Sequence, residues 1–126
     1  MRLERADLLQ IYYLMRLTRA IEDRTRTLFL QGRVAGGVYT AQGHEATTVG
    51  AAWTLSDGDS IVPQHRDLGM HLTRGGSPRA VMTQWLARGN SPALGRDGQI
   101  HINQLDTPSF RVLAWTSDTS FIQRRM

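Results

Sequence analysis

Three side chains with useful chemistry follow one another in the chain: His65, Arg66 and Asp67. They come directly after the apolar run Ile61–Pro63, which predicts a short buried strand whose carboxyl end would present them in a loop. Arginine carries a rigid fork of donors that suits phosphate, and histidine can donate, accept or change charge near neutral pH. Taken alone, however, these residues favour an exposed, charged turn between a strand and a helix.

Other kinds of site find little support in the spacing of residues. The histidines, at positions 44, 65, 71 and 101, include no pair one helical turn apart, and no carboxylate stands at a familiar metal-ligand offset from them. The chain has no serine elbow and no dinucleotide-binding glycine fingerprint. Cysteine and lysine are both absent, which excludes thiol catalysis and a lysine Schiff base. Spacing alone therefore leaves the chemistry undetermined.

The composition is that of one ordinary globular domain. The chain has 126 residues, of which 40% are hydrophobic and 21% charged. No apolar run approaches the roughly 20 residues that span a bilayer, and the charged N-terminus lacks the apolar core of a secretory signal. We therefore expect a cytoplasmic protein without a membrane partner. All 15 basic residues are arginines, but they are scattered along the chain, which favours a solvated mixed-charge surface over nucleic-acid binding.

The elements that must position these side chains begin with a long amphipathic helix over residues 1–31. Its expected apolar stripe recurs at helical spacing and comprises Leu8, Ile11, Leu14, Met15, Leu17, Ile21 and Leu28. On the helix surface, Arg19 with Asp23 and Glu22 with Arg26 are spaced for ion pairs.

Shorter elements follow this helix. We expect a glycine-rich loop over 32–43, helices over 44–55, 67–73 and 77–89, a turn over 56–60 and a final strand over 112–115. Ser77 should cap the last helix, with Pro78 at its first position. The irregular stretch 89–110 is long for a compact domain, which predicts a functional loop.

The order of features along nearly the whole chain has a counterpart in a known family. The residues that carry this likeness are Met15-Arg16, Arg19, Glu22, Gln31–Val34, Gly43–Ala46, Gly50, Asp59–Ile61, His65–Gly69, Leu72–Gly75, Met82 and Gly95–His101. In order and spacing they resemble the N-terminal part of the alpha subunit of thiamine-diphosphate-dependent 2-oxo acid dehydrogenases. This group includes the pyruvate, branched-chain 2-oxo acid and acetoin enzymes.

The resemblance implies an α/β fold in which a parallel sheet is flanked by helices. Residues 1–126 would form a partial thiamine-diphosphate-binding domain that is mostly helical and truncated at its C-terminus. The implied reaction is oxidative decarboxylation of a 2-oxo acid with acyl transfer to a lipoyl group. The implied partners are a beta subunit, in a heterotetramer, and a lipoyl acyltransferase component. As a fragment, the chain would be inactive alone.

The resemblance also assigns roles to individual residues. It implies cofactor contacts for His65 and Arg66, with the arginine toward the diphosphate, although His65 stands where the family usually has tyrosine. His101 would lie beside the diphosphate and the active-site channel, as a cofactor-binding and catalytic residue, and Tyr39 would be a catalytic residue of the substrate-side loop. The family holds magnesium through a Gly-Asp-Gly segment that would follow this chain, so no metal ligand is expected here.

A second hypothesis belongs to a different class of function. The chain would be a non-catalytic interaction module that keeps the helical scaffold and pairs with a beta subunit or another protein. Decarboxylase activity in the assembled complex distinguishes the two hypotheses.

Overall fold

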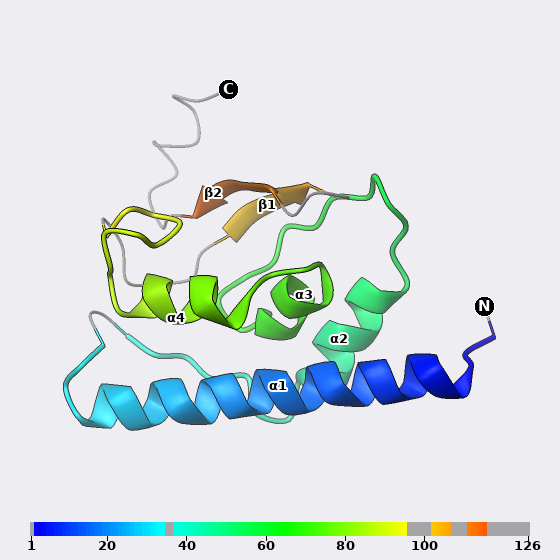
Figure 1. Ribbon diagram of the computed structural model, residues 1–126, viewed down its shortest axis with the longest axis horizontal. Helices are drawn as coiled ribbons and strands as arrows, with labels where there is room; N and C mark the ends of the chain where they lie inside the picture. The colour runs from blue at the N-terminus through cyan, green and yellow to red at the C-terminus, as the bar shows by residue number, and fades with distance from the viewer. Residues whose placement is uncertain (1, 35–36, 96–101, 107–110, 116–126) are drawn as a thin grey trace.

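The described residues form one long helix, three short helices and a pair of strands (Figure 1). The computed structural model describes residues 2–34, 37–95, 102–106 and 111–115. Its elements are α1 (Arg5–Leu30), α2 (Glu45–Trp53), α3 (Leu68–Thr73), α4 (Pro78–Trp85), β1 (Ile102–Asp106) and β2 (Arg111–Trp115). In Figure 1, α1 runs along one side of the molecule, the short helices form a middle layer, and the strands lie beyond them. The expectation of a mostly helical chain is confirmed.

The core lies between α1 and the short helices. It consists of Leu14, Ile21, Leu28, Val34, Val49, Leu68, Leu72, Val81 and Trp85. The expected stripe of α1 is confirmed from Ile11 to Leu28, where its members belong to the core or pack against it, but the prediction was wrong for Leu8, whose side chain is 54% exposed. The short helices lie along α1 mainly beyond its first turns, so the start of this helix is less covered than its middle (Figure 1). Among the described residues, no helix is both long and apolar enough to cross a membrane.

Three helices end in the same way, with a residue of positive φ just past the last turn. Gly32 (φ 67°) follows α1 and Gly75 (φ 93°) follows α3, as glycine at such positions leads one to expect. At the end of α4 this residue is Ala87 (φ 47°), and the Arg88 amide donates back to the Thr83 carbonyl at 3.0 Å. The predicted end of this helix at Gly89 was therefore wrong, because the reversal takes place at an alanine.

Two further predictions need correction. The expected strand Ile61–Pro63 is reduced to a single bridge residue at Ile61, and the Val62 side chain is 69% exposed. Pro63 has no amide hydrogen to donate to a neighbouring strand, which disfavours continued pairing. The stretch 89–110 is not one long loop, because its residues Ile102–Asp106 form β1.

The strands β1 and β2 pair in antiparallel fashion, with Asp106 opposite Arg111 and Ile102 opposite Trp115. The predicted final strand is confirmed as β2. The described residues contain no parallel strand pair. The parallel sheet flanked by helices thus stays a prediction drawn from the family resemblance.

Replacement of Ser77 by alanine should lower the free energy of unfolding by about 1 kcal/mol. The Ser77 hydroxyl accepts a hydrogen bond from the Ala80 amide at 3.1 Å, which satisfies one of the free donors at the start of α4. Urea denaturation followed by circular dichroism measures the change. Ser60→Ala, at an exposed serine in a turn, is the control and should change little. Equal effects of the two substitutions would show that the cap contributes nothing.

Candidate functional site

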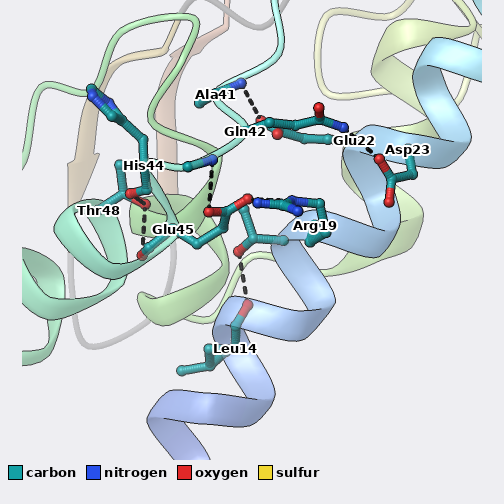
Figure 2. A network of polar contacts seen from close by, with 11 residues as sticks. Leu14, Arg19, Glu22, Asp23, Ala41, Gln42, His44, Glu45 and Thr48 are labelled. Carbon is teal, nitrogen blue, oxygen red and sulfur yellow. Dashed lines mark hydrogen bonds and ion pairs between the residues drawn. The ribbon is translucent and has the colours of Figure 1, made fainter.

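A network of polar contacts joins α1 to the segment that leads into α2 (Figure 2). The Arg19 guanidinium donates from Nε to Oε1 of Glu45 at 2.6 Å, and the two residues form an ion pair. The other carboxylate oxygen, Oε2 of Glu45, accepts a hydrogen bond from the backbone amide of Gly43 at 3.0 Å. The Glu45 carboxylate thus binds both α1, through Arg19, and the loop that precedes α2, through Gly43.

A second carboxylate of α1 holds the same loop. Glu22 is 2% exposed, and its Oε1 accepts a hydrogen bond from the backbone amide of Ala41 at 3.0 Å. Next to it, Asp23 accepts from the side-chain amide of Gln42 (Figure 2). The surface ion pairs expected along α1 were therefore wrong: Arg19 pairs with α2, and Glu22 faces inward. The helix rotation that buries Leu14, Ile21 and Leu28 also buries position 22, which lies on the same face.

The charges of the network are arranged unevenly. Burial raises the pKa of Glu22, and the nearby Glu45 carboxylate raises it too, while the Ala41 hydrogen bond and Arg19 act against them. Burial also acts to raise the pKa of Glu45, but its bonds with Arg19 and with backbone amides outweigh burial and lower it. The hydrogen bond to Glu45 in turn raises the pKa of Arg19. Of the two carboxylates, Glu22 is therefore the one that retains its proton more readily as the pH falls.

The held loop carries Tyr39, and the structure brings this residue to His65. The ring centroids are 5.2 Å apart and the ring planes meet at 65°, an edge-to-face contact. Tyr39 is 51% exposed and His65 half-buried. Two of the residues that the family resemblance singled out thus meet in space, although 26 positions separate them in the chain.

Arg66 follows His65 directly in the chain and lies on a tight turn. The turn is closed by Asp67, whose amide donates to the Gln64 carbonyl at 3.1 Å and whose carboxylate accepts from the Gln64 amide at 2.8 Å. Asp67 therefore shapes the backbone that presents His65 and Arg66, and the Arg66 side chain is exposed. The expected charged turn between elements is confirmed, with α3 as the element that follows it. His101 lies outside the described residues.

The contacting pair Tyr39 and His65, with the exposed Arg66 next in the chain after His65, offers a hydroxyl, an imidazole and a guanidinium. Guanidinium binds phosphate in bidentate fashion and aromatic rings stack on other rings, so side chains of these kinds can contact an anionic ligand that also carries a ring. Among the described residues, no group of three or more histidine, aspartate or glutamate side chains could hold a metal ion.

Sequence reasoning missed the inward roles of Glu22 and Glu45. Position 22 follows Ile21 and precedes Thr25 on the face of α1 that carries the core, so a carboxylate there was a readable sign of a buried polar contact. The hydrogen-bond donor to Glu22 could not be predicted from the sequence. It is the Ala41 amide, which lies 19 positions away and comes close to Glu22 only because of how the loop folds.

The known proteins to which this chain is similar include alpha subunits of oxidoreductases and dehydrogenases. The family model described as dehydrogenase E1 component matches residues 12–112. The alpha subunit of acetoin:2,6-dichlorophenolindophenol oxidoreductase is 34% identical in Cupriavidus necator, over 82% of this chain and 31% of that protein, and 35% identical in Bacillus subtilis, over 78% and 29%. The pyruvate dehydrogenase E1 component subunit alpha of Zymomonas mobilis is 32% identical over 79% of this chain and 28% of its own length. The match thus spans only 28–31% of these relatives.

Proposed function

Because this chain belongs to the dehydrogenase E1 component family, we propose that it forms the N-terminal wall of a thiamine-diphosphate site in a 2-oxo acid dehydrogenase alpha subunit. The observation that carries the proposal is the contact between Tyr39 and His65, the residue that directly precedes the exposed Arg66. Names of the relatives support the class of enzyme, since they are alpha subunits that act in acetoin and pyruvate metabolism.

Each of the three residues has a distinct role in this proposal. Arg66 binds the diphosphate through charge-assisted hydrogen bonds, which are about twice as strong as neutral ones. His65 precedes it in the chain and contacts the cofactor with its ring. Tyr39 faces the substrate and can donate a hydrogen bond from its hydroxyl to a carboxylate or carbonyl oxygen. His101 completes the set as a contact near the diphosphate.

The activity belongs to a larger assembly than this chain. Thiamine diphosphate, when bound, supplies the nucleophilic carbon that attacks the 2-oxo group and accepts the electron pair left by carbon dioxide. This chain's residues orient that cofactor and the substrate. We further propose a cytoplasmic heterotetramer with a beta subunit, which passes the acyl group to a lipoyl acyltransferase, with magnesium held by segments beyond this chain. Neither nucleic acid nor membrane has a part in it, and the chain alone does not decarboxylate.

Titration of the chain with thiamine diphosphate, followed by nuclear magnetic resonance, tests the proposal. We expect weak binding that shifts the ring resonances of His65 and Tyr39, because the match spans only 28–31% of the relatives' length. Arg66→Gln should weaken the response about tenfold or more, since a hydrogen bond to a charged group contributes roughly 1.5–3 kcal/mol. Arg79→Gln, at an exposed arginine of α4, is the matched control and should leave binding unchanged. Binding that does not depend on Arg66, or that leaves both rings unshifted, would refute the proposed site.

One observation favours a role in subunit contact as well. Leu8, Leu9, Tyr12 and Tyr13, in the first half of α1, are each more than half exposed. Such an apolar helix face is typical of a surface that another protein covers. The non-catalytic interaction module predicts co-purification with a partner and no decarboxylase activity in the complex, whereas the enzyme reading predicts activity once the missing parts are supplied.

A further inference from the structure

The loop that carries Tyr39 is tied down immediately after this residue, at three successive positions. The Ala41 amide donates to Glu22, the Gln42 side chain donates to Asp23, and the Gly43 amide donates to Glu45. Glu22 and Glu45, which we call the carboxylate clamp, take backbone hydrogen bonds from the loop and come from two different helices (Figure 2). A backbone held at both Ala41 and Gly43 cannot shift without breaking contacts to α1 or α2.

Tyr39 depends on this anchoring because its side chain is only partly buried. At 51% exposed, it gains from burial only part of what a core tyrosine would gain. Its ring lies over Gly37, where a Cβ would come within 3.0 Å of the ring edge, and against His65. Both of these contacts require the backbone at residue 39 to stay where it is.

The two halves of the clamp differ in charge. Glu45 is paired with Arg19, so its negative charge is compensated. Glu22 is faced by Arg19 and Asp23 on its own helix, by Glu45 on α2 and by the Ala41 amide of the loop. One of its oxygens, Oε2, is buried and has no hydrogen-bond partner among the described residues. A neutral group at this position that keeps one acceptor oxygen would therefore serve the loop as well as the glutamate does.

We propose that the carboxylate clamp is a positioning device that sets Tyr39 against His65, with Glu22 acting through its single acceptor oxygen and not through its charge. The importance of the Tyr39 position for substrate rests on the proposed function, but the positioning itself does not. Glu22 touches neither cofactor nor substrate in this proposal. It is a positioning residue that acts through the loop backbone.

Two variants of nearly equal size test the proposal. Glu22→Gln keeps an acceptor for the Ala41 amide, whereas Glu22→Met fills the same space without one, and neither leaves a buried charge that would prevent folding. Amide hydrogen exchange of the chain should become about tenfold faster at Ala41 in Glu22→Met, as expected for loss of a hydrogen bond contributing about 1.4 kcal/mol, and stay near wild type in Glu22→Gln. The nuclear Overhauser contact between Tyr39 and His65 should weaken in Glu22→Met alone.

The outcomes separate this proposal from the function on which it builds. Exchange at Val49, in the core, reports whether each variant is folded. Unchanged protection of Ala41 in a folded Glu22→Met chain, or equal loss in both variants, overturns the positioning role. Neither measurement involves thiamine diphosphate, so a chain whose rings do not respond to the cofactor refutes the proposed function while the exchange rates still decide what Glu22 does.

Discussion

A methyl group added at Gly69 is expected to lower the free energy of unfolding by about 1–3 kcal/mol, the range of overpacked cores. Gly69 lies in α3 at its closest approach to α2, where a Cβ would collide with the Thr48 hydroxyl and come within 3.0 Å of Val49 Cγ2. Both neighbours are buried, and the Thr48 hydroxyl is hydrogen-bonded within its own helix, at 3.2 Å to the carbonyl of His44. The neighbours thus have little room to move.

The direction of this effect distinguishes packing from helix propensity. Alanine is a better helix former than glycine by about 1 kcal/mol, so propensity alone predicts that Gly69→Ala stabilises. Gly50→Ala is the matched control, because Gly50 lies in α2 with open space where its Cβ would be, and it should stabilise by up to about 1 kcal/mol. Urea denaturation of both variants measures the contrast. Stabilisation by both substitutions would mean that the two helices are not packed as closely as described.

Acid should destabilise the chain through His71. This histidine is completely buried in α3, and burial lowers its pKa from 6.5 to about 3. Below pH 6.5 the histidine binds a proton in the unfolded chain but not in the folded chain. Its contribution to stability is therefore present above that pH and is lost as the pH falls toward the folded pKa. The loss should approach about 1.4 kcal/mol per pH unit.

Comparison with a variant isolates this contribution. The free energy of unfolding of wild type and of His71→Gln is measured between pH 6.5 and pH 4.5, and the difference between the two curves should change steadily over this range. Glu22 titrates in the opposite sense, because its raised pKa favours stability at low pH and removes it as the pH rises above 4.5, but it is present in both proteins and cancels. His44→Gln, at an exposed histidine, is the matched control. Parallel curves for His71→Gln and wild type would show that His71 does not titrate as a buried group.

Local signals in the sequence were sufficient for much of the helical framework. The Ser77-Pro78 start of α4 and the glycines that end α1 and α3 follow from backbone conformations and hydrogen bonds within a few residues. The reversal at Ala87, just after α4, could not be predicted because alanine has no local preference for positive φ. Only the surrounding structure enforces this conformation there.

Side-chain burial depended on contacts with distant parts of the chain. Helical spacing assigned both Leu8 and Leu14 to the apolar stripe, but Leu14 is buried and Leu8 is 54% exposed, which depends on what packs against each part of α1. The predicted ion pair between Glu22 and Arg26 is reasonable for an isolated helix. The prediction was wrong because the Glu22 carboxylate instead accepts a hydrogen bond from an amide of the loop after α1.

For the candidate site, too, some features follow from the sequence and others from the tertiary structure. The order of motifs along the chain by itself indicated the family, which the match to the family model confirms, because such motifs are a matter of residue types and spacing. The roles of His65, Arg66 and Tyr39 stay predictions drawn from the resemblance. Only the tertiary structure decided that Tyr39 meets His65 and that Glu22 and Glu45 hold the loop between them. Contacts across 19 to 26 positions leave no periodic trace in the sequence, since they arise when the core brings α1, α2 and the loop together.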